Sequence, residues 1–347
     1  MRKSIFLYFL LSVYWLTQWL IVPCYAEIPF RVMCYNVENA FDCENDSLTN
    51  DDDFTPQGAY HWTPKKFKLK ISNIAKVITA VGQFTPPSIV GLCEIENESV
   101  LKSLVYFSPL RNLNYKYVHY DSPDKRGIDV ALLYRPEQFR VLSSAPIGVS
   151  FASAPFSTTR DILYVKGIAM YTDTLHIFVC HFPSRLGGEL ESEDRRIEVS
   201  RILRKQVDSL FLASPTSTML LMGDFNDYPT NTSLFSILQA QDPQNAIIRS
   251  YGLYNLYYQY HNKPNIGTHK HATEWGVLDQ MIVSGNALQP DAFFYTSEQS
   301  AKIFDAEFLL IDDETYFGKK TFRTYLGMKY IGGFADHLPI YIDFFQR

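Results

Sequence analysis

Polar and titratable side chains stand at the ends of several apolar runs in this chain of 347 residues. One run, residues 218–222, passes through Gly223 to Asp224 and Asn226. An unbroken apolar run is typical of a strand buried on both faces, and glycine allows the chain to turn tightly at its end. Asp224 and Asn226, two residues apart, point to one side and can orient a water beside a phosphate. Taken alone, the motif also fits a polar turn after a core strand.

The same arrangement recurs along the chain. Carboxylates or histidines follow or interrupt further apolar runs at Glu94, His181, Asp279, Asp336 and His337, and Asn36 and Glu38 share one face at the end of an early strand. Asp129 lies inside an apolar strand, where burial without a partner would cost roughly 2 to 7 kcal/mol, so an imidazole or an arginine should lie beside it. Several strands are therefore expected to deliver acid-base groups to one cleft.

Helices and strands alternate only loosely. Helices are predicted from Thr63 and Pro64 to Gly82, from a cap at Ser192 through Leu210, and over 232–238. Strands are predicted over residues 30–36, 88–94, 115–120, 126–135, 162–170, 175–180, 218–222, 277–283 and 338–342. Consecutive strands favour two packed sheets flanked by helices over a doubly wound parallel sheet. No linker or repeat divides residues 27–347, which we interpret as one domain.

The first 26 residues have the pattern of a secretory signal peptide. Arg2 and Lys3 precede an apolar run over residues 5–22, and cleavage is predicted after Ala26. A membrane anchor is the alternative, since the run approaches the ~20 residues that a span needs. Cys24 would allow a lipoprotein, although Pro23 before it fits poorly. A secreted or periplasmic protein is predicted.

Net charge, the acidic loop and the cysteine positions each indicate what the protein can bind. The net charge of −5 provides no overall basic field for nucleic acid, so such a substrate would need a local patch. The acidic loop over residues 42–53 lacks the glycine and final glutamate of an EF-hand and is predicted to be solvated. Cys34, Cys93 and Cys180 lie in apolar strands and are predicted to be buried thiols.

Six short motifs, in this order, resemble the endonuclease/exonuclease/phosphatase superfamily, which includes pancreatic-type deoxyribonucleases, abasic-site endonucleases, neutral sphingomyelinases and inositol-polyphosphate 5-phosphatases. The resemblance covers residues 27–347 and implies an α/β (α+β) fold, a four-layered α/β sandwich of two packed mixed β-sheets flanked by helices. The motifs are Asn36-Val37-Glu38-Asn39, Cys93-Glu94-Ile95-Glu96, His181-Phe182-Pro183-Ser184, Gly223-Asp224-Phe225-Asn226, Leu278-Asp279-Gln280 and Asp336-His337-Leu338-Pro339.

The resemblance also implies a divalent metal site. Glu94 would be the main ligand of Mg²⁺, with Mn²⁺ as the alternative ion, and Asn36, Glu38 and Asp336 would lie nearby. Oxygen ligands suit Mg²⁺, which usually takes one or two carboxylates together with water and phosphate oxygens.

Catalytic roles follow from the same resemblance. Asp224 and Asn226 would hold the attacking water and a phosphate oxygen, and Asp279 would orient His337. Either Asp224 or the His337/Asp279 pair would activate the water. His181 would assist departure of the alcohol.

Three further residues complete the predicted site. Asp129 is proposed as the partner of His181, and Arg126 and Arg185 as ligands of substrate phosphate. The alternative for these arginines is surface solvation or helix pairing. Ala335 stands where relatives commonly carry serine, which removes a hydroxyl but no catalytic group.

The predicted function is a metal-dependent phosphoester hydrolase, specifically an extracellular or periplasmic endonuclease-like phosphodiesterase, with nucleic acid as a candidate substrate. The alternatives are a phosphatase or phospholipase C-type enzyme acting on inositol phosphates or sphingomyelin, and a non-catalytic binding protein of the same fold. A serine- or cysteine-based hydrolase is disfavoured because no nucleophile motif is present. A monomer without a stable protein partner is expected.

Overall fold

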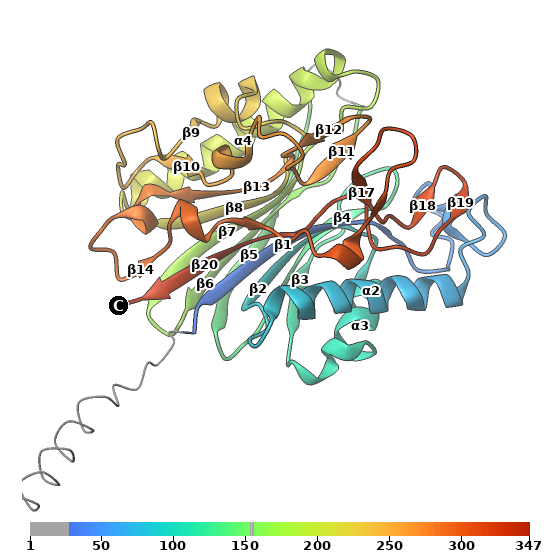
Figure 1. The fold of residues 1–347 in the computed structure, drawn as a ribbon. Helices are drawn as coiled ribbons and strands as arrows, with labels where there is room; N and C mark the ends of the chain where they lie inside the picture. Colours follow the sequence, from blue (N-terminus) through green and yellow to red (C-terminus); the bar gives the residue numbers. More distant parts are fainter. Residues whose placement is uncertain (1–27, 153, 155) are drawn as a thin grey trace, which may run out of the picture.

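Two β-sheets lie face to face with helices on both outer sides in the computed structural model, which describes residues 28–152, 154 and 156–347 (Figure 1). Helices α2 (Pro64–Gly82) and α3 (Glu98–Tyr106) cover one sheet, and α4 (Glu189–Ala213) covers the other. This is the predicted four-layered sandwich. The predicted signal peptide lies outside the described residues. Across the described chain, no helix is long and apolar enough to cross a membrane.

The first sheet has seven strands and contains both parallel and antiparallel pairs. Its order is β14-β20-β1-β2-β4-β3, and β15 pairs with β20. β1 runs parallel to β2 and antiparallel to β20, so the first and last strands of the domain are neighbours. The strands are β1 (Phe30–Ala40), β2 (Ile89–Ile95), β3 (Lys116–His119), β4 (Asp129–Tyr134), β14 (Phe294–Tyr295), β15 (Lys302–Ile303) and β20 (Ile340–Gln346).

The second sheet, also of seven strands, has the order β5-β6-β7-β8-β13-β10-β9. Three two-stranded hairpins stand outside the two sheets: β11 (His269–His271) with β12 (Glu274–Gly276), β16 (Leu310–Asp312) with β17 (Lys319–Thr321), and β18 (Tyr325–Leu326) with β19 (Lys329–Tyr330). The strands of the sheet are β5 (Phe139–Ile147), β6 (Ile162–Ala169), β7 (Asp173–His181), β8 (Thr218–Asp224), β9 (Ala240–Gln241), β10 (Leu253–Asn255) and β13 (Asp279–Ser284).

The apolar core has three layers that match the alternation of side chains along the strands. Between the sheets, residues such as Val32, Ile177 and Met222 are fully buried. Ile74 of α2 packs on the outer face of the first sheet, and Leu203 of α4 packs on the second. The central strands are therefore buried on both faces, as their unbroken apolar sequences predicted. Cys34, Cys93 and Cys180 are buried free thiols, also as predicted.

The pairing of β7, β8 and β13 aligns three polar residues in one row. His181 lies opposite Asp224 on the parallel strand β8, and Asp224 lies opposite Asp279 on β13. Gly223 makes this close approach possible, because a Cβ atom there would stand 1.8 Å from the backbone oxygen of Cys180. Its φ of +151° is also one that other residues rarely adopt.

Helix α4 differs from the prediction at its start. It begins at Glu189 after Gly188, three residues before the predicted cap at Ser192. The Ser192 hydroxyl instead donates to the Gly188 carbonyl at 2.6 Å and accepts from Arg196 at 2.6 Å, so it bonds inside the first turn. The predicted helix over 232–238 is a single π-helical turn, Ser233–Ile237.

The acidic loop is not solvated throughout. Asp51 is 1% exposed and accepts the Asp46 N–H at 2.9 Å, while Glu44 is exposed as predicted. Part of the loop's charge therefore organises the turn itself.

A buried histidine outside the row of His181, Asp224 and Asp279 makes the stability of the fold depend on pH. His176 on β7 bonds the Tyr164 hydroxyl at 2.8 Å, and burial lowers its pKa to about 4. An unfolded histidine titrates near 6.5, so this group adds stability above that pH, and the contribution is lost as pH falls toward 4. We expect His176→Gln to reduce the loss of unfolding free energy between pH 7 and pH 4.5 by about 1 to 2 kcal/mol.

Urea denaturation at the two pH values measures this difference. His271→Gln, at an exposed position, is the matched control. Equal pH dependence in wild type and His176→Gln would contradict the assignment.

Candidate active site

His337 and Asp279 form a close buried pair. The Nδ1 atom of His337 lies 2.6 Å from a carboxylate oxygen of Asp279, the arrangement that the sequence predicted. The other ring nitrogen lies 3.7 Å from Asp224. Burial would lower the pKa of His337, but Asp279 and Asp224 together hold it well above its usual value. His337 is thus a cation fixed in orientation by Asp279.

Asp224 stands between two imidazoles. One carboxylate oxygen lies 3.6 Å from His181 and 3.7 Å from His337, and it accepts from the Asn36 amide at 3.1 Å. The other oxygen accepts the Asn226 N–H at 2.9 Å. Burial raises the pKa of Asp224 to about 6. A carboxylate with such a pKa is suited to take a proton near neutral pH.

His181 reaches the same cleft from the neighbouring strand. Its Nε2 atom lies 3.6 Å from Asp224 and 3.9 Å from Glu94, and its Nδ1 atom is buried without a hydrogen-bond partner among the described residues. Burial lowers the pKa of His181 well below its usual value, and Arg160 and Arg126 add to that. His181 is therefore a neutral imidazole.

The predicted pairing of Asp129 with His181 is wrong. Asp129 accepts instead from the backbone N–H of Ser122 at 3.0 Å and lies 3.2 Å from a ring nitrogen of His119. The prediction that it needs a polar partner was correct, but β3 supplies the imidazole because β3 and β4 are neighbours in the first sheet. Sequence spacing could not show which histidine that would be.

Glu94 stands near the end of β2, and Asn36 lies on the parallel strand β1, where the pairing with β2 becomes irregular. The backbone of Glu94 is left-handed (φ 67°), as are those of Glu38, Asn39 and Asn226. Such conformations are costly for residues other than glycine and cluster where function requires them. They turn the Glu94 carboxylate to within 3.5 Å of the Asn36 amide, and it also accepts the Asn39 N–H at 2.8 Å.

Arg323, which no sequence motif indicated, joins two of the predicted metal ligands. Its guanidinium donates to Glu38 at 2.8 Å and to Asp336 at 2.9 Å, and Glu38 also accepts the Thr324 N–H. Buried Lys70 adds positive charge beside the same acids, and burial lowers the pKa of this lysine to about 8. Glu38 and Asp336 are therefore neutralised by the chain's own cations.

His269 is a second residue that the motifs missed. It forms an isolated bridge with His337, and the two rings lie 4.7 Å apart. Burial lowers the pKa of His269 to about 4, so it is neutral beside the His337 cation. The irregular sequence around β11 gave no periodic signal for this contact.

The two arginines predicted to bind phosphate differ in their surroundings. Arg126 is about half exposed and near enough to lower the pKa of His181. Arg185 is engaged internally: it pairs with Glu189 at 2.9 Å, donates to the Asn226 carbonyl at 2.8 Å and stacks over Tyr228. Arg185 thus positions the loop after β8 rather than standing free for substrate.

The donor groups fit a hard divalent cation at Glu94. This carboxylate is partly exposed and, among the described residues, pairs with no lysine or arginine. Oxygen donors are what Mg²⁺ and Mn²⁺ prefer. Asn36 presents its amide nitrogen to Glu94 and Asp224, so it positions both carboxylates. Glu38 does not fit as a ligand, because Arg323 and Thr324 occupy both of its oxygens.

Comparison with known proteins identifies the group to which this site belongs. Residues 31–346 match the model of the endonuclease/exonuclease/phosphatase family. The chain belongs to this family. Its members are phosphoester hydrolases. No curated protein matches the sequence.

Solved structures share the fold at low identity. The human Nocturnin catalytic domain aligns at 15% identity and a TM-score of 0.54 over 92% of this chain and 96% of that one. A family protein from Bacteroides thetaiotaomicron aligns at 16% and 0.56 over 93% and 100%. A mannosyl-6-phosphatase from the same organism aligns at 16% and 0.55 over 91% and 99%.

Removal of the Glu94 carboxylate should abolish metal binding and hydrolysis together. We expect Glu94→Ala to lose Mn²⁺ binding measured by calorimetry, and to hydrolyse bis- and mono-p-nitrophenyl phosphate at least about 10²-fold more slowly, because charge on the phosphate is no longer neutralised. Chelation of the wild type should do the same. Glu98→Ala, exposed on α3, is the control, and undiminished activity after either treatment would overturn the assignment.

The leaving group of the substrate should affect the activity of the His181 and His337 variants differently. Replacement of either by alanine should lower kcat by about 10² to 10⁴, the range for positioned acid-base groups. A substrate with a good leaving group should rescue His181→Ala more than His337→Ala, since only His181 would act on the departing oxygen. Equal rescue across a series of aryl phosphates would mean that the roles are misassigned.

Proposed function

We propose that this protein is a divalent-metal-dependent phosphoester hydrolase. The observation that carries the proposal is the position of Asp224, which lies within 3.7 Å of both His181 and the oriented His337. Glu94 lies beside them with a carboxylate that forms no ion pair with a lysine or arginine in the described chain. One cleft thus offers a base, a fixed cation, a neutral imidazole and an oxygen ligand.

Each residue has a task that follows from its surroundings. Asp224 takes a proton from the attacking water, and the His337 cation, held by Asp279, faces the developing negative charge. His181, as a neutral imidazole, stabilises the leaving oxygen by a hydrogen bond from its N–H, and the departing alcohol takes its proton from the solvent. Asn226 holds the loop in place, since its amide donates to the Phe182 carbonyl at 3.0 Å. A divalent cation at Glu94 would supply Lewis-acid neutralisation of the phosphate oxygens.

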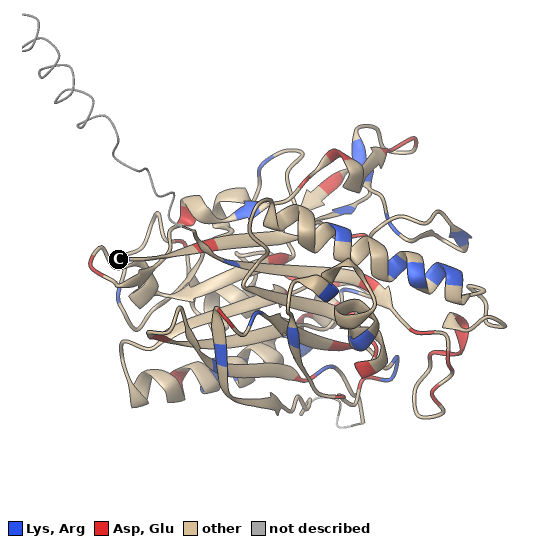
Figure 2. Cartoon of the chain, turned by 90° about the horizontal axis from the view of Figure 1, so that it is seen from below, with Lys and Arg blue, Asp and Glu red and all other residues tan. Residues whose placement is uncertain are grey.

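The substrate is proposed from charge. An endonuclease-like phosphodiesterase needs arginines or lysines that contact successive phosphates. Arg160 and Arg196 are buried in pairs with Asp124 and Asp227, and Arg185 is also engaged internally. Figure 2 shows basic and acidic residues interspersed, with a run of lysines confined to α2. These observations favour a small phosphoester over a polynucleotide.

We also propose where the protein resides, which metal ion it uses and whether it assembles. The protein is secreted or periplasmic after cleavage at Ala26, with lipid attachment at Cys24 as the alternative. It uses Mg²⁺ or Mn²⁺ and acts as a monomer. The similarity in fold to a mannosyl-6-phosphatase supports a phosphatase of small substrates.

Salt dependence separates the candidate substrates. The test panel contains plasmid DNA, single-stranded DNA, RNA, sphingomyelin, inositol phosphates and sugar phosphates. A nuclease should lose affinity with a log-log slope of about −0.9 for each duplex phosphate neutralised, whereas an enzyme that binds one phosphate should show a much flatter slope. We expect turnover of small phosphoesters with a flat slope.

Plasmid cleavage with a steep slope would restore the nuclease interpretation. Inactivity on the whole panel with Mg²⁺ and with Mn²⁺ would favour the non-catalytic alternative.

A further inference from the structure

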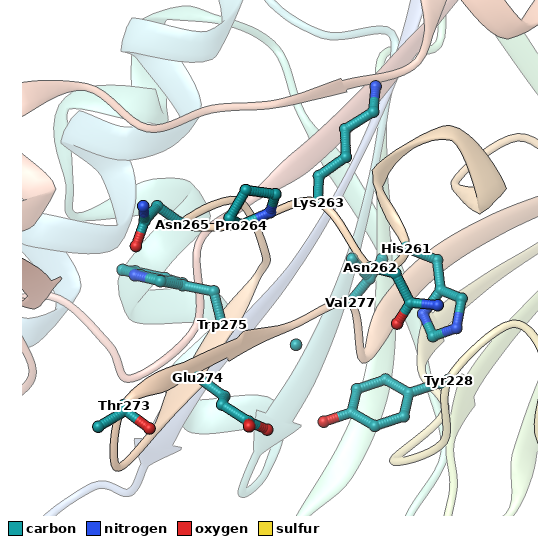
Figure 3. Close-up of a pocket in the computed structure, with 11 residues that line it drawn as sticks. Tyr228, His261, Asn262, Lys263, Pro264, Asn265, Thr273, Glu274, Trp275 and Val277 are labelled. Carbon is teal, nitrogen blue, oxygen red and sulfur yellow. The ribbon is translucent and has the colours of Figure 1, made fainter.

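A hollow of about 420 Å³ opens beside the loop that carries Asp224 and Asn226. Figure 3 shows it between the start of β12 and the segment before residue 266. Asn262 and Asn265 have left-handed backbones that shape this segment around the hollow. Its lining includes Tyr228, His261, Asn262, Asn265, Glu274 and Trp275.

Direct contacts connect the hollow to the catalytic residues. Tyr228 lies two residues after Asn226, and its ring packs against Gly276, where a Cβ atom would come within 2.7 Å of it. Gly276 pairs with His269, which in turn bridges His337. Thr268 accepts the backbone N–H of Asp279 and donates to the Gly276 carbonyl from its own backbone. None of the catalytic residues lines the hollow, but its lining includes Tyr228 and Val277, which stand on the segments that directly follow Asp224 and precede Asp279.

The polar groups of the hollow are available for a ligand. Among the described residues, neither the Glu274 carboxylate nor the Tyr228 hydroxyl has a hydrogen-bond partner, and both point into the space between them (Figure 3). Asn262 and Asn265 add amides that both donate and accept. This mixture of acceptors and donors matches a ligand with several hydroxyl groups.

The aromatic rings define the shape of that ligand. Trp275 is seen edge-on in Figure 3 and Tyr228 nearly face-on, so the two rings do not form a parallel slot for a flat base. Trp275 can instead cover one apolar face of a puckered ring, whereas the Tyr228 ring already contacts Arg185 and His261 and offers its hydroxyl edge. Lys263 is the only lysine or arginine in the lining of this hollow, and its amino group extends away from the hollow over the Tyr260 ring (Figure 3). The hollow is not built to bind a second phosphate.

We propose that this hollow is a subsite for the sugar ring of a hexose phosphate whose phosphate lies at Asp224 and His337. The inference rests on the proposed hydrolase function and names its substrate class. Trp275 covers the ring, and Glu274, the Tyr228 hydroxyl and the two asparagines bond its hydroxyls. The volume is within the range usual for small-ligand sites.

Kinetics with matched substrates tests the subsite. Phosphate release is measured with mannose 6-phosphate and glucose 6-phosphate, with AMP, and with ethyl phosphate, which has no ring. We expect the kcat/KM ratio of hexose phosphate to ethyl phosphate to fall at least about 10-fold in Trp275→Ala and in Glu274→Gln, mainly through KM. Phe84→Ala is the control, because Phe84 is fully exposed at the opposite end of β2 from Glu94.

Binding without turnover supplies the second measurement. Tryptophan fluorescence is titrated with mannose 6-phosphate in Glu94→Ala, and the Trp275→Phe, Glu94→Ala double variant identifies the part that arises from Trp275. A saturable change that disappears in the double variant supports the subsite. If esters are hydrolysed without a preference for hexoses and Trp275 gives no signal, the subsite is overturned and the proposed function is not. If the variants instead lower the kcat/KM ratio of AMP to ethyl phosphate, the hollow binds a base and the hexose subsite is overturned. No hydrolysis of any ester would overturn the proposed function, while the fluorescence titration still decides the subsite.

Discussion

The alignment of three strands is the constraint on which the rest of the structure depends. Parallel pairing of β7 with β8 and antiparallel pairing of β8 with β13 set His181, Asp224 and Asp279 directly opposite one another. Because side chains alternate between the faces of a sheet, a slip of one residue would turn one of these groups toward the opposite face. Gly223 fixes the alignment, since only a residue without Cβ fits against the Cys180 carbonyl. The register of hydrogen bonds between these strands therefore determines which side chains face one another in the cleft.

Carboxylates gathered in one cleft would repel each other strongly unless the chain supplied cations. Arg323 and Lys70 neutralise the side that contains Glu38 and Asp336, and His337 offsets part of the charge of Asp224 and Asp279. Glu94 forms no ion pair with a lysine or arginine in the described chain, so its carboxylate is less engaged with the chain's own cations than Glu38 or Asp336. This division of charge limits which of the acids can hold an external ion. It also shows that a motif residue can serve charge balance rather than coordination.

Sequence reasoning succeeded where one strand determined the outcome. Buried strands, the start of α2 and the delivery of Glu94 to a strand end follow from local patterns, and the pairing of Asp279 with His337 followed from the family resemblance. It failed where the outcome depended on which strands pair or on segments without a periodic pattern. Asp129 contacts His119 because their strands pair, which the sequence did not show. The bond of Arg323 to Glu38 was missed because Arg323 lies in a segment without a periodic pattern. The residue types of Glu94 and Asn226 likewise did not indicate that their backbones are left-handed.

The bond from Arg323 to Glu38 joins residues 285 positions apart, and β1 completes its sheet only when β20 pairs with it. Such long-range contacts cost much loop entropy before they add stability, so they form late in folding. A partly synthesised chain lacks Asp336 and His337 until β20 is about to follow, because both residues precede that strand directly. The candidate site therefore cannot assemble before the segment that pairs with β1 has been made.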